Sequence, residues 1–387
     1  MTKHNIKIII VLFALFSNVT AMAKVDYWPT QAWKTRTLEE AGFDRDKFQK
    51  VLDYVWEDEG NHKSDAFVVI KDGYLVYEGY DRGYHPKRKH MFWSLTKSLT
   101  STIIGAAIHR GHIELDALAK DYYPEMNREK AKDVTLRHIL NMSAGFKFYE
   151  ENPINIALSD SIFVYYSKKA YRDVAKHVAS LEMKYAPDEQ FNYGTHQPML
   201  AMGMLKKAIN NPSIYDELPW ELLFKPLGIK NIVFERDLAG TFLGGSTGWG
   251  VAKEYAKLGL LMLEDGIWEG KRILPEGWVK FATQTVAPAL LKKKSEDGEM
   301  RLNVESYGAY WWLNKKLPMN KTRPYPSAPE TLYQAMGFRG QTMGVLPEQN
   351  IIIVRMGSDG RKPKKKLKRD KFYKLLMNSL KPNGVTK

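Results

Sequence analysis

Cysteine is absent from this 387-residue chain. Its absence excludes disulfide bonds, a thiolate metal site, a cysteine nucleophile and a lipid-modified N-terminal cysteine. Small exported domains commonly depend on disulfides for stability, but a chain of this length can bury a large hydrophobic core without them. The composition is therefore compatible with an exported globular protein.

Long apolar runs are few, and the one that stands out is Ile8–Val19. A short cationic segment precedes it, and Ala21-Met22-Ala23 supplies the small-x-small pattern that signal peptidases recognise. The run is too short to span a bilayer stably, and polar residues follow at once. We therefore expect residues 1–23 to be a secretory signal peptide and residues 24–387 to be exported, to the periplasm or, alternatively, out of the cell. An uncleaved membrane anchor is the other interpretation.

Acidic residues are outnumbered, with 44 Asp and Glu against 58 Lys and Arg, which gives a formal charge of +14. Loss of Lys3 and Lys7 with the signal peptide would lower this charge by two. A positive excess suits nucleic acid, an anionic membrane surface or an acidic wall polymer, and export argues against nucleic acid as a partner. Much of the excess lies in Arg361–Arg369. This run is typical of a solvated helix face, and contact with an anionic envelope surface is the alternative.

Histidine is missing from the chain after residue 196, because all nine histidines lie at or before His196. Gly244–Gly248 matches the nucleophile elbow of α/β-hydrolases, but that fold needs its catalytic histidine after the serine. We therefore expect Ser246 to be a turn residue. His109 and His112 lie three apart, yet no glutamate motif or third ligand accompanies them. We expect neither a metal site nor another cofactor.

Strand-forming runs lie near both ends of the chain, and no repeat or linker divides it. Residues 66–70 and 74–78 flank Asp72-Gly73, which predicts an antiparallel hairpin. The late runs are 306–313, 331–336 and 349–356, and we expect a glycine-containing turn at 338–341 to join the last two.

The middle of the chain, residues 115–264, is mostly helical in pattern, most clearly at 135–140 and 198–209. Strands at both ends with helices between them predict an α+β fold. In this fold the segments 24–114 and 265–387 form one antiparallel sheet with flanking helices, and a helical subdomain is inserted between them. We expect a cleft where the two parts meet.

The chemistry-bearing feature is Ser94-Leu95-Thr96-Lys97, at the start of a helix that extends to Ile108 and is apolar on nearly all sides. Serine and lysine three positions apart lie on one helical face, so the amine can reach the hydroxyl. Burial would lower the pKa of the lysine and make it a usable base. The helix N-terminus also supplies backbone N–H groups where an oxyanion would develop. A surface lysine on an ordinary helix is the structural alternative.

Two further segments are candidates for the same catalytic site as Ser94 and Lys97. Tyr193, within Phe191-Asn192-Tyr193-Gly194-Thr195, can face Lys97 and carry a proton to a leaving group. Gly337, at the end of a predicted strand, allows substrate to lie against the backbone, so that an N–H there completes an oxyanion hole with that of Ser94. Taken alone, the tyrosine would be a packing residue and the glycine part of an ordinary turn.

Ser94-x-x-Lys97, Tyr193 and the Gly337 strand, in this order, resemble the three motifs of serine β-lactamases and penicillin-binding proteins. The likeness is greater to the class C-type branch, which contains esterases and 6-aminohexanoate-dimer hydrolases, and it covers nearly all of the chain after the signal. Further family-like stretches are 68–73, 135–145, 245–246, 255–261 and 273–278. The resemblance implies a β-lactamase/transpeptidase-like fold.

The resemblance also implies roles for individual residues. Ser94 would attack a carbonyl carbon, Lys97 would accept its proton, and Tyr193 would assist this transfer and protonate the leaving group. The backbone amides of Ser94 and Phe338 would bind the oxyanion, with Gln341 as the alternative to Phe338. The same Tyr/Lys pair would activate water for deacylation. Thr195, Gly337 and Gln341, which lie in or beside the second and third motifs, would contact the substrate.

Two departures from the family pattern bear on the substrate. Thr195 stands where the second motif usually ends in Asn or Ser. Ala335-Met336-Gly337 replaces the Lys-Thr/Ser-Gly of the third motif, whose lysine would contact the carboxylate of a β-lactam or D-Ala-D-Ala terminus; Arg339 is the nearest substitute. We therefore expect ester or amide hydrolysis. The alternatives are a β-lactamase or D-Ala-D-Ala carboxypeptidase, and a non-catalytic envelope-binding protein with the same fold.

Overall fold

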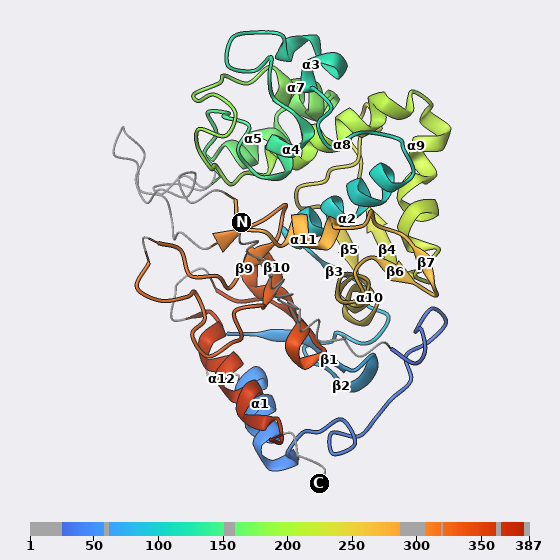
Figure 1. Cartoon of the computed structure of the whole chain (residues 1–387), viewed down its shortest axis with the longest axis vertical. Coiled ribbons are helices and arrows are strands. Elements are labelled where there is room, and N and C mark those ends of the chain that lie inside the picture. The colour runs from blue at the N-terminus through green and yellow to red at the C-terminus, as the bar shows by residue number, and fades with distance from the viewer. Residues whose placement is uncertain are drawn as a thin grey trace, which may run out of the picture.

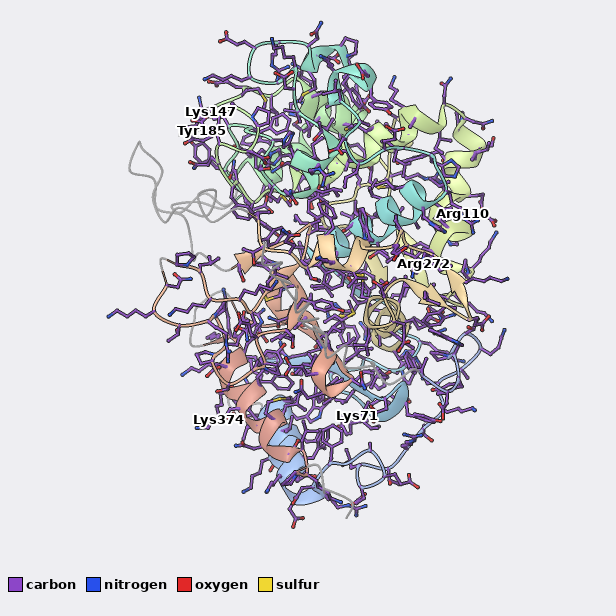
Figure 2. All side chains as sticks on the ribbon, viewed as in Figure 1. Lys71, Arg110, Lys147, Tyr185, Arg272 and Lys374 are labelled. Atoms are coloured by element: carbon purple, nitrogen blue, oxygen red, sulfur yellow. The ribbon has the colours of Figure 1, made fainter. Side chains whose placement is uncertain are left out.

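The computed structural model describes residues 25–57, 62–150, 159–286, 306–318, 320–360 and 365–382. The expected signal peptide and residues 361–364 of the basic run lie outside the described residues. The chain forms a sheet-containing part at one end and a largely helical part at the other, with one helix, α2 (Leu95–His109), between them (Figure 1). Charged side chains point outward from both parts, for example Lys374 and Lys147 (Figure 2).

The main sheet has seven strands in the order β2-β1-β12-β11-β10-β9-β8, and every neighbouring pair is antiparallel. The first two strands come from the N-terminal segment and the other five from the C-terminal segment. The expected α+β class with its antiparallel sheet is thereby confirmed. The strands are β1 Ser64–Lys71, β2 Tyr74–Tyr80, β8 Ser306–Tyr307, β9 Trp312–Leu313, β10 Tyr333–Gly337, β11 Gln341–Leu346 and β12 Ile351–Gly357.

The hairpin predicted around Asp72-Gly73 is present and joins β1 to β2. Both turn residues have positive φ, 50° for Asp72 and 80° for Gly73. Two consecutive residues of this kind are typical of the two-residue turns that match the twist of paired strands. The sequence signal works here because the turn is local.

Two predictions about the late strands were wrong. The run 306–313 is not one strand, because the chain reverses between β8 and β9 at Tyr310, whose φ is 65°. The turn at 338–341 leads from β10 into β11, a strand that was not predicted, and residues 347–350 then lead into β12. Gly344 weakens the strand pattern of β11, but it is required there, since a Cβ would lie 2.7 Å from the hydroxyl oxygen of Tyr373.

Helices cover both faces of the sheet. Along β1, Val68 and Ile70 pack into the cluster that includes α2 and α10, whereas Phe67 and Val69 pack into the cluster that includes α1 and α12. Alternation of this kind follows from the two-residue period of a strand. These helices are α1 Arg45–Trp56, α2 Leu95–His109, α10 Ala252–Leu263 and α12 Arg369–Ser379.

The helical part is built around α8, in which ten consecutive residues from its start are buried. Helices α4 and α7 pack against it, as does α2. The helices predicted at 135–140 and 198–209 are present, and α8 begins two residues early, at His196. The remaining helices are α3 Ala119–Tyr122, α4 Leu136–Leu140, α5 Asp160–Tyr166, α6 Lys168–Arg172, α7 Val174–Ala179, α8 His196–Ile209, α9 Pro212–Pro219 and α11 Trp278–Ala282. Short helical turns span Pro124–Met126, Trp220–Phe224, Phe338–Gly340 and Pro347–Gln349.

Two small sheets complete the fold: one of β3 His90–Met91, β5 Gly248–Gly250 and β4 Ile232–Phe234, the other of β6 Ile267–Trp268 and β7 Lys271–Arg272. Helix α10 lies against the main sheet, where a Cβ on Gly259 would meet Ile352. We therefore propose that the sheet part resumes before α10, rather than at residue 265. Across the described ranges, we find no helix that is both long and apolar enough to cross a membrane.

Candidate active site

Ser94 lies at the N-terminal end of α2, directly after a residue in the left-handed region, Trp93, with φ 51°. The approach to Ser94 is fixed by β3, which pairs with β5, and by the amide of Phe92, which donates to the carbonyl of Gly248 at 2.8 Å. Ser94 is half-buried. This sharp entry places its hydroxyl at the first turn of the helix. The backbone N–H groups of Leu95 and Thr96 in this turn donate to the carbonyls of Phe92 and Trp93 at 3.2 and 2.9 Å.

Lys97 is buried, with 1% of its side chain exposed. Its Nζ lies 2.9 Å from Ser94 Oγ, and it donates to Thr195 Oγ1 at 3.1 Å and to the carbonyl oxygen of Gly245 at 3.0 Å. Burial lowers the pKa of Lys97 from 10.5 to about 8, and the nearby Glu150 carboxylate opposes part of this shift. A hydroxyl and a lysine that readily loses its charge therefore lie in contact.

Thr195, 2% exposed, stands at the start of α8. Its hydroxyl accepts from Lys97 and lies 2.5 Å from Glu150 Oε1, and its backbone N–H donates to Glu150 Oε2 at 2.7 Å. These contacts lie within the protein and connect Thr195 to the lysine; the contact with substrate that the sequence suggested stays a prediction. Glu150 itself gave no sequence signal, because it lies in a loop 45 positions from Thr195.

Tyr193 faces the same lysine. The Nζ of Lys97 lies 4.9 Å from the centroid of its ring, which also packs against Tyr307 and Trp312 at 5.9 and 5.2 Å. The loop that carries it is fixed by Asn192, whose side-chain amide donates to two backbone carbonyls at 3.0 Å. The structure therefore brings Ser94, Lys97 and Tyr193 together from two separate segments.

The third motif, which contains Gly337, also lies beside Ser94. A Cβ on Gly337, the last residue of β10, would collide with the carbonyl oxygen of Phe92 and lie 3.1 Å from Leu95, so glycine lets β10 approach the start of α2. The next residue, Phe338, packs its ring against Trp93 with centroids 5.3 Å apart. The backbone of Phe338 is thus held beside the nucleophile.

Gln341 supports this turn from behind. Its side chain is fully buried, and its amide nitrogen donates to the carbonyls of Phe338 at 3.1 Å and Gly357 at 2.6 Å, while its oxygen accepts from the Gly357 N–H at 3.0 Å. The side chain therefore holds the turn, and the substrate contact that the sequence suggested for this residue stays a prediction. The neighbouring Arg339, with φ 62°, donates from Nε to the carbonyl of Asp359 at 3.4 Å.

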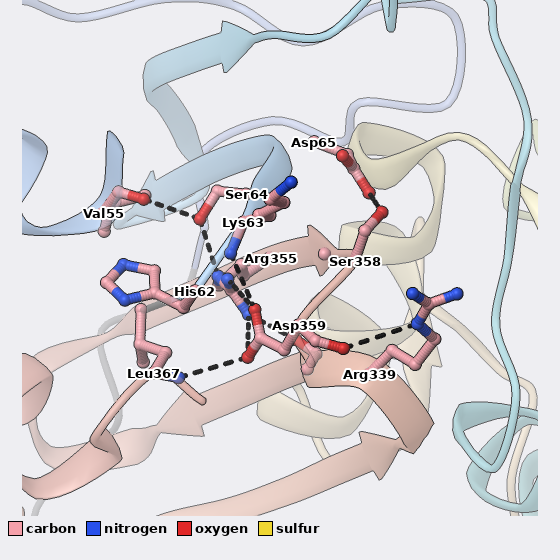
Figure 3. Close-up of polar contacts among 12 residues, drawn as sticks. Val55, His62, Lys63, Ser64, Asp65, Arg339, Arg355, Ser358, Asp359 and Leu367 are labelled. Atoms are coloured by element: carbon pink, nitrogen blue, oxygen red, sulfur yellow. Dashed lines mark hydrogen bonds and ion pairs between the residues drawn. The ribbon is translucent and has the colours of Figure 1, made fainter. Parts of the chain in front are cut away.

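A buried ion pair lies beneath the same turn. Arg355 on β12 and Asp359 are 4% and 2% exposed, with Nη2 and Oδ1 2.6 Å apart. Figure 3 shows the Asp359 carboxylate also accepting from the backbone amides of Lys63 and Leu367. Arg355 in turn donates to the carbonyl of Gly340 at 3.0 Å and to Ser64 Oγ at 2.8 Å. This network connects the turn to the first residue of β1 and to the C-terminal segment.

His196 lies next to Thr195 and is completely buried, stacked on Phe148 with ring centroids 3.8 Å apart. Within the described residues neither ring nitrogen has a hydrogen-bond partner. Burial, with a smaller contribution from the Lys97 charge, lowers the pKa of His196 well below its ordinary value. The ring is therefore neutral and adds no second positive charge beside the lysine.

The protein-family model described as Beta-lactamase matches residues 45–376. The chain belongs to the beta-lactamase family. The resemblance inferred from the sequence motifs is thereby confirmed, and the protein is an enzyme of the serine hydrolase type.

Other members of the beta-lactamase family extend this comparison. The chain is 21% identical over 319 residues to the 6-aminohexanoate-dimer hydrolase of Paenarthrobacter ureafaciens, across 76% of this chain and 72% of that protein. A Bacillus anthracis protein proposed as a 6-aminohexanoate-dimer hydrolase superposes with TM-score 0.66 at 19% identity, covering 92% of this chain and 89% of that one. A family VIII carboxylesterase superposes with TM-score 0.63 at 16% identity, covering 86% and 98%. At these identities the structural likenesses show the fold.

Residues 244–248, whose sequence matches a nucleophile elbow, have a different role in this beta-lactamase-family site. Ser246 Oγ donates to the hydroxyl of Tyr165 at 2.6 Å, and the residue is 8% exposed. A strand, β5, follows it instead of the helix that an elbow requires. Its neighbour Gly245 supplies the carbonyl that binds Lys97, a contact the sequence did not suggest. The described part of the chain contains no group of three or more His, Asp or Glu side chains that could hold a metal ion.

Proposed function

We propose that this protein is an exported hydrolase that cleaves ester or amide bonds through an acyl-enzyme on Ser94. The observation that carries the proposal is the contact of 2.9 Å between Ser94 Oγ and the buried Nζ of Lys97. A serine hydroxyl is a weak nucleophile unless a base removes its proton, and an uncharged lysine can do so. Burial and the lowered pKa of Lys97 both favour the uncharged amine.

The proposed reaction begins with attack of Ser94 Oγ on the substrate carbonyl carbon, while its proton passes to Lys97. The backbone amides of Ser94 and Phe338 bind the oxyanion that forms, at the first turn of α2 and at the end of β10. Tyr193 then gives its proton to the leaving alcohol or amine and takes up the proton held by Lys97, so that the leaving group departs as the acyl-enzyme forms and Lys97 is again uncharged. A water molecule deprotonated by the same Tyr/Lys pair releases the acid and regenerates Ser94.

An ester or amide substrate is preferred over a β-lactam because of the residues on β10. Ala335 is buried, and Met336 and Gly337 complete the strand without a cation. Arg339, which follows on the turn, already donates to the Asp359 carbonyl. The 6-aminohexanoate-dimer hydrolase and carboxylesterase among the similar proteins support the same preference.

The nucleophile is tested with a fluorophosphonate probe on the purified protein. Wild type should be labelled once, with the added mass on the peptide that contains Ser94, and Ser94→Ala should remain unlabelled. A well-folded wild type that resists labelling would favour the non-catalytic, envelope-binding alternative. A labelled Ser94→Ala would assign the nucleophile elsewhere.

The substrate class is tested by comparing short p-nitrophenyl esters and linear amides with nitrocefin. We expect turnover of the esters to exceed that of nitrocefin, because β10 offers no lysine for the carboxylate of a β-lactam. Faster turnover of nitrocefin would refute this use of the third motif and favour the β-lactamase or carboxypeptidase alternative.

Export and envelope contact are also proposed, on the sequence alone. If residues 1–23 are a signal peptide, the intact mass of the protein from the periplasm corresponds to a chain that begins at Lys24. If the basic run binds an anionic surface, sedimentation with phosphatidylglycerol vesicles falls when Lys365, Lys366 and Lys368 are changed to Gln. An uncleaved chain, or sedimentation unaffected by these changes, would refute the respective proposal.

A further inference from the structure

Glu150 holds Thr195 at two points. Its Oε2 accepts the Thr195 backbone N–H at 2.7 Å, and its Oε1 lies 2.5 Å from the Thr195 hydroxyl oxygen. Its carboxylate is 21% exposed, and Oε1 is 3.9 Å from Nζ of Lys97. Glu150 is therefore linked to the base mainly through Thr195, with its charge nearby.

The direction of each hydrogen bond around Lys97 follows from counting donors and acceptors. An ionised carboxylate only accepts, so the Thr195 hydroxyl must give its single proton to Glu150. The Thr195 oxygen then faces Lys97 with a lone pair alone. The carbonyl of Gly245, 3.0 Å from Nζ, likewise only accepts.

An uncharged lysine amine has two N–H bonds and one lone pair. Gly245 and Thr195 take one N–H each, which leaves the lone pair as the only group that can meet the Ser94 hydroxyl proton. If the Thr195 hydroxyl were free to rotate, it could donate to this lone pair and so compete with Ser94. The donor and acceptor roles in the hydrogen bonds that join Lys97, Thr195 and Glu150 thus depend on the Glu150 carboxylate.

We propose that Glu150 is a positioning residue for the general base, which fixes the Thr195 hydroxyl as an acceptor and thereby directs the lone pair of Lys97 at Ser94. This inference rests on the proposed function, since it concerns the base of the same acylation step. It assigns a role to a residue that none of the three motifs contains.

Glu150 also acts through its charge, and the two effects have different signatures. Three groups face Lys97: the Glu150 carboxylate, the ring of Tyr193 in the loop before α8, and the neutral ring of His196 on α8. Glu150 raises the pKa of Lys97 against the effect of burial. Loss of its charge alone would move the pH midpoint of acylation downward and leave the rate at high pH nearly unchanged. Loss of positioning lowers that high-pH rate itself.

The experiment measures the rate of fluorophosphonate labelling from pH 6 to 10.5, with incubations from seconds to days, so that slow variants remain measurable. In Glu150→Ala we expect the high-pH rate to fall roughly 10- to 100-fold, part of what a positioned general base supplies. The matched control is Glu189→Ala, which removes another carboxylate that accepts a backbone N–H, that of Ala186 at 2.9 Å. It should retain the wild-type rate. Thermal melting checks that each variant is folded.

A second comparison, in which Glu150→Ala is made in a Thr195→Val protein, separates positioning through the Thr195 hydroxyl from any effect of Glu150 that does not pass through it. In Thr195→Val the hydroxyl is gone, so Glu150→Ala should cause no further loss of the high-pH rate. An equal loss in both backgrounds, or an unchanged high-pH rate in Glu150→Ala, would overturn the inference. Failure of the proposed function looks different, because wild type would then resist labelling or Ser94→Ala would be labelled.

Discussion

The carbonyl oxygen of Gly245 lies 3.0 Å from Nζ of Lys97 and accepts one of its hydrogen bonds. These residues are 148 positions apart, and Gly245 belongs to the segment whose sequence imitates a nucleophile elbow. The segment therefore takes part in the site through its backbone, and the serine beside it points to Tyr165 instead.

Substitution of Gly245 by alanine tests this contact. A Cβ there would lie 2.5 Å from Thr195 Cγ2 and 2.8 Å from the Thr195 carbonyl oxygen, so the backbone must move and the carbonyl with it. We expect fluorophosphonate labelling to slow roughly 10- to 100-fold, since small displacements of catalytic groups have effects of this size. Ser246→Ala is the control and should label at the wild-type rate. Loss of labelling in Ser246→Ala would revive the elbow interpretation.

The lowered pKa of Lys97 has a consequence for stability. Burial lowers this pKa from 10.5 in the unfolded chain to about 8 in the folded protein, so the charged form is disfavoured by folding. The resulting penalty is complete below pH 8 and disappears as the pH rises toward 10.5. Relative to Lys97→Met, wild type should therefore gain about 3 kcal/mol of unfolding free energy between pH 7 and pH 10.5. Urea denaturation at both pH values measures the difference. A constant difference would mean that Lys97 is not desolvated.

Tyr193→Phe should separate the shuttle hydroxyl from the packing of its ring. The ring contacts with Tyr307 and Trp312 remain in this variant, so the melting temperature should change little. Turnover of a linear amide, whose leaving amine must be protonated, should fall by about 100-fold, as expected for loss of a positioned proton-transfer group. An amide turnover equal to that of wild type would assign proton transfer to another group.

Asp359→Ala should destabilise the protein strongly. The substitution leaves the Arg355 guanidinium buried without its counterion, which typically costs about 3–5 kcal/mol. Because Arg355 also donates to the Gly340 carbonyl, the turn that carries Phe338 should loosen, and acylation should slow in the protein that remains folded. The double variant Arg355→Met/Asp359→Leu should recover much of the stability, as measured by chemical denaturation. If it is as unstable as Asp359→Ala, the buried charge is not the cause.

The parts of the site that lie within a few residues of one another were accessible from the sequence. Ser94 and Lys97 share a helix, and the apolar residues around them predict the burial that the structure shows. The hairpin at Asp72-Gly73 is local in the same sense. In each case the spacing along the chain determines the spacing in space.

The rest depends on where distant segments meet. Glu150 and Gly245 reach Lys97 only because two loops of the helical part converge on α2, and neither residue carries a periodic or compositional signal. The buried amide of Gln341 is a further example, since its sequence position suggested substrate and its surroundings place it against backbone carbonyls. Strand β11 was not predicted because Gly344 interrupts its strand pattern. The reason for this glycine is the space taken by Tyr373 on α12, which is distant in sequence.

The pairing of β1 with β12 sets the order in which the molecule can be completed. Ser64 and Arg355, which contact each other across this pair, are 291 positions apart. During synthesis the N-terminal hairpin therefore waits, with an unsatisfied strand edge, until almost the whole polypeptide has emerged. Contacts so remote in sequence make folding slow. A nascent chain that cannot complete its central sheet early therefore remains incompletely folded for a long time.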